Sequence, residues 1–178
     1  MTALDRDSGC DITVAVRAGG WRGALPDAPK ICRRAAHAAL AVAGVRNVAA
    51  ELGIVLGDDD LVAGYNLEWR DEAGPTNVLS FPVRDLVAGA PFASAAHDAP
   101  VLLGDVVIAF EYAGAEAERH GIAFSDHVSH LVIHGVLHLL GHDHERKDQA
   151  DRMEALEISA LSRLGVANPL SRGHALVP

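Results

Sequence analysis

The sequence has few cysteines and no long apolar run, and each shortage excludes a class of protein. Two cysteines occur, Cys10 and Cys32, and we expect ordinary reduced thiols rather than a disulfide framework. Every apolar stretch is interrupted by His, Gly or charge well short of the roughly 18 residues that a membrane-spanning helix needs. The polar start, Met1 to Asp11, does not resemble an export signal. We therefore expect a cytoplasmic protein without a membrane partner.

Positively charged residues are fewer than negatively charged ones. The chain has 15 Lys and Arg against 24 Asp and Glu, a formal net charge of −9. Because affinity for a phosphate backbone comes largely from basic side chains, this balance argues against a general nucleic-acid coat protein. Several basic residues nevertheless fall between residues 30 and 84, whereas 145–157 is rich in acids. A local basic groove on an acidic protein remains compatible with this distribution.

The length of 178 residues is that of one domain, and no internal repeat is present. Hydrophobic periodicity predicts strands over 12–16, 48–56, 76–81 and 102–110, and helices over about 29–43, 61–70, 111–121, 127–140 and 148–164. This alternation predicts a single α/β (α+β) domain over 1–178, with one roughly four-stranded mixed sheet and about five helices. We expect 85–100 to be a mobile loop and 166–178 a frayed tail.

Three positions predict where elements begin or end. Residues 57–60, Gly-Asp-Asp-Asp, end the second strand with an N-cap signal for the next helix. Ser125 predicts the N-cap of the helix over 127–140. Pro82 closes the third strand, which is therefore expected at an edge of the sheet.

Histidine is concentrated in one stretch, since six of the ten histidines lie between His127 and His144. His134 and His138 are four residues apart in an apolar, helix-permissive run. This spacing places both imidazoles on one helix face, where they can share a metal ion. The alternative is a buried helix whose histidines are satisfied by core hydrogen bonds.

A third histidine follows a glycine. On a straight helix His144 would lie roughly 9 Å beyond His138, so the chain must leave the helix to bring them together. Gly141 can adopt the left-handed conformation that ends helices and turns the chain back. His134, His138 and His144 would then supply three nitrogen ligands and leave a fourth position open, as in catalytic zinc sites. We expect one zinc ion per chain, although three imidazoles also suit nickel, cobalt or copper.

The histidine spacing is similar to the long zincin motif of metallopeptidases. Those enzymes carry Glu, their general base, directly after the first histidine, and Gly135 stands at that position here. A peptidase is therefore a weak alternative.

The pattern His-Gly-x-Leu-His-Leu-x-Gly-x-Asp-His at 134–144 resembles the motif of the YbeY family of metal-dependent rRNA-maturation endoribonucleases. Residues 67–70, 75–82 and 103–106 support the resemblance, which runs from about 48 to 165. Two positions depart from the family pattern: Asn77 stands where Asp is usual, and His142 where Tyr is usual.

The resemblance implies a single-strand-specific endoribonuclease that acts on rRNA precursors, in particular the 3′ end of small-subunit rRNA, and in ribosome quality control. It implies as partners the ribosome, small-subunit assembly proteins or an associated GTPase. It also assigns Arg70 as the active-site arginine, whose planar fork suits a phosphate. The alternative for Arg70 is a structural role, in a surface salt bridge with Glu68 or Asp71 that contributes little to stability.

A different class of function also remains open. The chain could be a ribosome-assembly binding factor whose zinc is structural, and His142 is the nearby candidate for a fourth, closing ligand. In the enzyme, His142 or Asp143 could assist proton transfer, although a turn role is favoured for Asp143. His127 and His130 are expected to be buried packing residues without a metal role.

Overall fold

A computed structural model describes residues 9–45, 48–90 and 100–167. The expected mobile loop over 85–100 and the expected frayed tail over 166–178 fall largely on residues 91–99 and 168–178, outside the described residues. Within the described part of the chain, no helix is both long and apolar enough to cross a membrane.

The sheet has four strands in the order β1-β2-β4-β3. The strands are β1 (Cys10–Val16), β2 (Ala50–Gly57), β3 (Val78–Pro82) and β4 (Val101–Ala109). β1, β2 and β4 run parallel, whereas β3 pairs antiparallel with β4 and forms an edge. The predicted mixed sheet is therefore confirmed, and Pro82 ends an edge strand, where a missing N–H costs no ladder bond.

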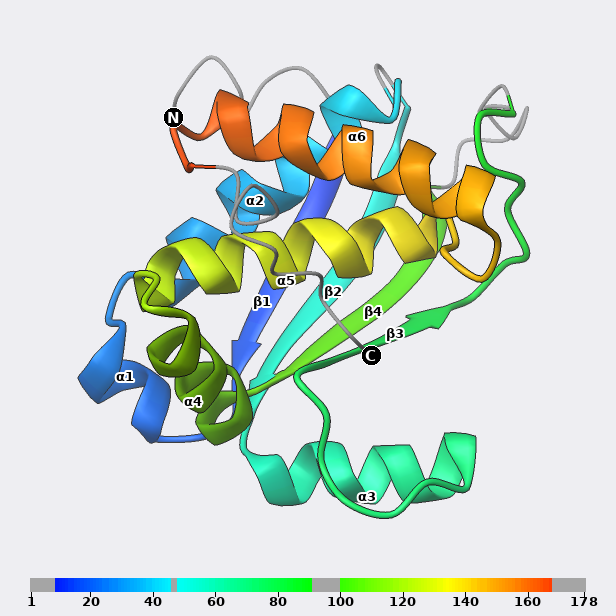
Figure 1. Cartoon of the computed structure of the whole chain (residues 1–178). Helices are drawn as coiled ribbons and strands as arrows, with labels where there is room; N and C mark the ends of the chain where they lie inside the picture. Colours follow the sequence, from blue (N-terminus) through cyan, green and yellow to red (C-terminus); the bar gives the residue numbers. More distant parts are fainter. Residues whose placement is uncertain (1–8, 46–47, 91–99, 168–178) are drawn as a thin grey trace.

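Six helices occur in the described part of the chain: α1 (Gly20–Ala24), α2 (Ala28–Val42), α3 (Asp59–Arg70), α4 (Phe110–His120), α5 (Phe124–Leu139) and α6 (Lys147–Arg163). The five predicted helices are all present, and the addition is the five-residue α1. Figure 1 shows α2, α5 and α6 on one face of the sheet and α3 on the other. The side chains carried by α3 therefore reach the edge of the sheet from the side opposite α5.

Helix α5 lies inside the fold, between the sheet and α6 (Figure 1). Twelve of its sixteen residues are buried. It touches the edge strand closely, because Ser80 of β3 donates a hydrogen bond to the Gly135 carbonyl at 3.1 Å. A Cβ at Gly135 would lie 2.6 Å from Val106 Cγ1. Glycine at this position thus permits the close approach of α5 to the sheet.

One predicted helix cap is confirmed and one is wrong. The Asp58 carboxylate accepts a hydrogen bond from the Leu61 N–H at 2.9 Å, as an N-cap does. Helix α5 begins earlier than predicted, at Phe124, with Ala123 rather than Ser125 as N-cap. The reason is tertiary: the Phe124 ring stacks on Trp21 with centroids 5.5 Å apart, so aromatic packing determines where this helix starts.

Candidate metal centre

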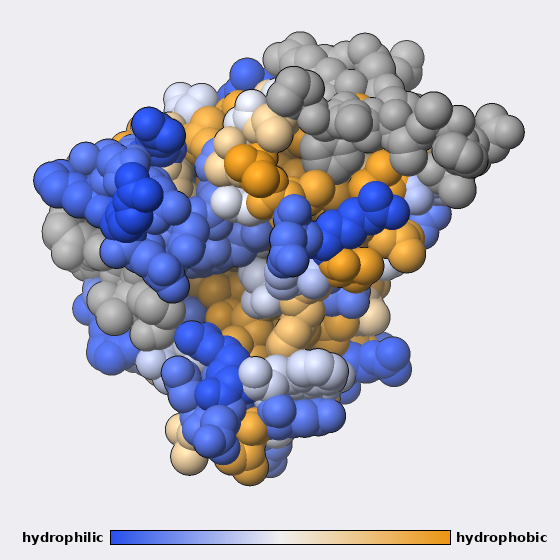
Figure 2. Space-filling view, turned by 90° about the vertical axis from the view of Figure 1, so that its right-hand side faces the viewer, coloured by the Kyte–Doolittle hydropathy of each residue, from blue (hydrophilic) through white to orange (hydrophobic). Residues whose placement is uncertain are grey.

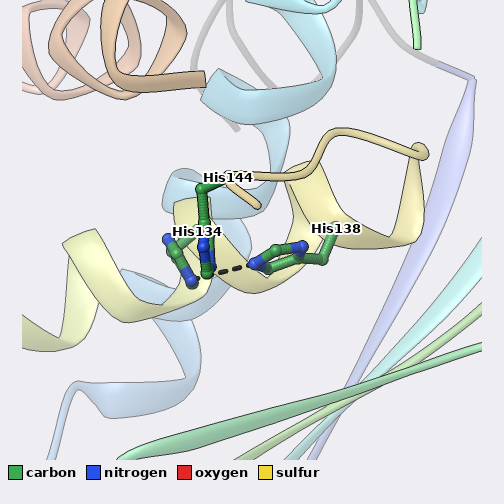
Figure 3. A group of neighbouring side chains, drawn as sticks. All are labelled: His134, His138 and His144. Carbon is green, nitrogen blue, oxygen red and sulfur yellow. Dashed lines mark hydrogen bonds between the residues drawn. The ribbon is translucent and has the colours of Figure 1, made fainter. Parts of the chain in front are cut away.

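Three imidazoles converge at the C-terminal end of α5. His134 and His138 come from the helix, and His144 comes from the segment that follows it (Figure 3). Their candidate ligand atoms all lie within 4.8 Å of one another. Among the described residues, this group holds three histidines and no fourth His, Cys, Asp or Glu. The arrangement is the one that the histidine spacing predicted.

The turn that returns His144 is a helix C-cap of the Schellman type. Gly141 has a φ of 82°, in the left-handed region. The Gly141 N–H donates to the His138 carbonyl and the His142 N–H donates to the Leu137 carbonyl, both at 3.0 Å. The predicted role of Gly141 is therefore confirmed.

Gly141→Val is expected to weaken zinc binding by at least 10-fold although no ligand changes. A β-branched residue disfavours the left-handed backbone conformation. Its Cβ would also overlap the backbone carbonyl of Leu86. The affinity is measured by competition with a chromophoric zinc chelator. Gly114→Val is the control, because a Cβ at Gly114 would meet no atom within 4 Å beyond its chain neighbours and the backbone of its own helix. Unchanged affinity in Gly141→Val would show that the return of His144 does not depend on this turn.

Hydrogen bonds orient both helical imidazoles. His138 Nδ1 donates to the His142 carbonyl at 2.9 Å, and His134 Nδ1 contacts Glu157 Oε1 at 2.7 Å. The two Nε2 atoms consequently face each other, 3.0 Å apart. Two nitrogens bound tetrahedrally to one zinc at about 2.05 Å would be roughly 3.3 Å apart. The donor set therefore fits a borderline divalent ion with little rearrangement.

The protonation state of His138 also favours metal binding. Burial, together with the neighbouring His134 and His144, lowers the pKa of His138 to about 4. The ring is therefore neutral at pH 7, which is the form of imidazole that binds metals.

Glu157 is a site residue that the sequence analysis missed. One of its oxygens contacts His134 Nδ1, and the other contacts His130 Nε2 at 3.0 Å. Burial alone would raise the pKa of Glu157, but the hydrogen bonds and charges of the two imidazoles outweigh it and hold the pKa at about 2. The carboxylate is therefore ionised and orients His134. A signal was present: Glu157 lies four residues from both Met153 and Leu161, which are buried on the same helix face.

Glu157→Gln is expected to weaken zinc binding by about 10–100-fold, the usual effect of losing the carboxylate behind a histidine ligand. Glutamine preserves the shape, so the melting temperature tests separately for a loss of stability. Glu154→Gln, at an exposed position of the same helix, is the matched control. Zinc affinity equal in both variants would contradict the orienting role.

His127 and His130 have buried carboxylate partners and do not belong to the metal group. His127 Nε2 contacts Glu116 Oε2 at 2.9 Å, and the Asn77 amide donates to the same oxygen at 3.0 Å. An amide can donate to this carboxylate, whereas an ionised Asp at position 77 could not. This explains how the chain accommodates Asn77 at that position.

The three histidines line a cleft of about 1220 Å³ that also receives side chains from α3 and β3. Figure 2 shows an apolar hollow above α3, bounded by polar surface. Arg70, His142 and Asp143 line the same cleft. Asp143 is engaged in the turn, because its carboxylate accepts the His144 N–H at 2.7 Å.

Arg70 ends α3 and has 43% of its side chain exposed. Within the described part of the chain, Arg70 Nη2 forms an ion pair with Glu72 Oε1 at 3.8 Å and none with Glu68 or Asp71. So long and exposed a pair holds the guanidinium weakly. Arg70 is therefore available to a ligand in the cleft.

Comparisons with protein-family models and with known proteins both match this chain to YbeY endoribonucleases. The family described as Endoribonuclease YbeY matches residues 25–165, a span that begins before the expected start near 48. An Endoribonuclease YbeY of Paramagnetospirillum magneticum is 46% identical over 159 residues, covering 89% of this chain and 94% of that protein. One of Parvibaculum lavamentivorans is 49% identical over 168 residues, covering 94% and 88%.

A solved structure supports the fold alone. The solution structure of a Thermotoga maritima protein aligns with a TM-score of 0.50 at 18% identity, covering 93% of this chain and 97% of that one.

Proposed function

The chain belongs to the YbeY family of endoribonucleases, and from that premise we propose that it is a zinc-dependent endoribonuclease of single-stranded RNA. Its proposed substrate is precursor rRNA, in particular the 3′ end of small-subunit rRNA, and its proposed setting is rRNA maturation and ribosome quality control. The ribosome, small-subunit assembly proteins and an associated GTPase are proposed partners. The observation that carries the proposal is the triad of imidazoles in a cleft that also contains Arg70.

We propose that His134, His138 and His144 hold the zinc ion. A zinc ion bound there would supply Lewis-acid polarisation and water activation near neutral pH. The Arg70 guanidinium would hold the scissile phosphate through two parallel hydrogen bonds and stabilise the charge that develops during cleavage. Asp143 is occupied by the turn, so His142 is the candidate that we retain for accepting a proton.

Two observations favour the enzyme over the alternatives. A structural zinc would need a fourth protein ligand, and the metal-binding group contains none among the described residues. His142, the candidate for that ligand, is not part of the group. A peptidase would need a glutamate at position 135, where even a Cβ would lie 2.6 Å from Val106 Cγ1.

The test is a cleavage assay on purified protein whose zinc content has been measured. About one zinc per chain, cleavage of single-stranded but not duplex RNA, and loss of cleavage with a chelator that zinc reverses would support the proposal. RNA binding without cleavage at full zinc occupancy would instead favour the ribosome-assembly factor.

A further inference from the structure

We propose that Trp69, supported by Phe81 and Tyr65, forms a nucleobase-stacking subsite of the cleft. This inference rests on the proposed function, because it names where a base of the single-stranded substrate binds. All three aromatic side chains line the cleft that contains the three histidines.

Trp69 is exposed in a way that packing does not explain. It is 66% exposed, whereas Trp21 is 1% exposed, packs against Phe110 and Phe124, and donates its indole N–H to the Gly57 carbonyl. Trp21 therefore shows how this fold uses a tryptophan for its core. A large apolar side chain left in water at the wall of a cleft is typical of a binding surface.

The Phe81 ring contacts Trp69 and is itself supported by Tyr65. The Trp69 ring meets Phe81 at a centroid distance of 6.3 Å and an angle of 66°, and Phe81 meets Tyr65 at 5.8 Å and 70°. These are edge-to-face contacts, which fix the orientation of a ring without covering both of its faces. A face of the indole thus remains available to a planar ligand.

The guanidinium next to Trp69 fits a nucleotide chain as the ligand. Arg70 follows Trp69 directly and lines the same cleft. An aromatic face beside an arginine is the combination that binds single strands, because bases stack on the ring while the cation neutralises phosphate. The cleft, at about 1220 Å³, also exceeds the roughly 300–1,000 Å³ of small-ligand pockets, as a chain of nucleotides requires.

The aromatic subsite and the histidines lie on opposite sides of the edge strand β3. Ser80 points toward α5, where it binds the Gly135 carbonyl, and the next residue, Phe81, points toward α3, where it meets Tyr65. RNA that contacts both the aromatic subsite and the histidines must cross β3. At least one of its bases must then be unstacked from the neighbouring bases. A duplex keeps its bases paired and stacked inside the helix, so this subsite would select single strands.

Tryptophan fluorescence provides a direct test, because the chain has two tryptophans and Trp21 is buried. The zinc-loaded protein is titrated with single-stranded 2′-O-methyl RNA, with an abasic strand of equal charge, and with a duplex. We expect strong quenching by the first strand only, and its loss in Trp69→Phe, whose remaining signal comes from Trp21. Equal quenching by the abasic strand would overturn the inference, because the signal would then report phosphate binding.

Cleavage kinetics provide the second arm. Trp69→Ala should raise KM by roughly 5- to 100-fold, the effect of losing one stacked base, and change kcat little. Trp69→Phe should recover most of the loss. Leu67→Ala is the matched control, since Leu67 is 58% exposed on the same helix but does not line the cleft. A normal KM in Trp69→Ala would overturn the stacking subsite without contradicting the proposed nuclease activity. If the wild-type chain cleaves no RNA, the proposed function fails, and the quenching titration alone decides the subsite.

Discussion

His138→Ala is expected to lose the bound zinc and, with it, all measurable RNA cleavage. The imidazole contributes an Nε2 atom 3.0 Å from that of His134, and its Nδ1 is tied to the turn that carries His144. The change therefore removes one ligand and loosens the return of another. Losing only the hydrogen-bond partner of a metal ligand typically lowers metal affinity by about 10–100-fold. We expect zinc affinity to fall further than this in His138→Ala. His134→Ala should behave alike.

The measurement is zinc per chain after dialysis, alongside cleavage of single-stranded RNA and the melting temperature. His120→Ala, at the end of α4 and outside the metal group, should keep its zinc and its activity. Near-stoichiometric zinc in His138→Ala would reject this ligand set. Zinc loss accompanied by unchanged cleavage would separate the metal from the reaction and remove it from the mechanism.

Arg70→Glu is expected to abolish RNA cleavage while the protein keeps its zinc. Removing one group that stabilises transition-state charge typically lowers kcat by roughly 10²–10³-fold, and the new carboxylate would also repel the phosphate. Arg70→Lys should recover part of the activity, because an ammonium is a point charge without the bidentate fork. The fold should survive, since an exposed arginine in a last helical turn contributes about 1 kcal/mol or less.

Arg163→Glu is the matched control, because Arg163 occupies the last turn of α6 as Arg70 does that of α3. Cleavage rate, zinc content and melting temperature are compared across the wild type and these variants. Full activity in Arg70→Glu would exclude this arginine from the mechanism. Loss of zinc, or a drop in melting temperature well beyond that of Arg163→Glu, would make its role structural.

The sequence by itself determined the histidine triad and the class of fold. His134, His138, Gly141 and His144 lie within eleven residues, so helix periodicity and one left-handed turn are enough to bring the ligands together. The alternation of β and α periods likewise predicted the strands and the helices, and Pro82 predicted the edge position of β3. Each of these features depends on interactions between residues close in the chain.

Only the tertiary structure decided which distant residues meet the triad. Glu157 is 23 residues from His134, and their contact requires α6 to pack over α5. Trp69 and Arg70 reach the histidine cleft because β3 lies at the edge of the order β1-β2-β4-β3, between the layer that holds α3 and the layer that holds α5. Local periodicity does not encode strand order, because the order is chosen by the burial of whole faces against one another. For the same reason the start of α5 at Phe124 followed aromatic packing and not the capping preference of Ser125.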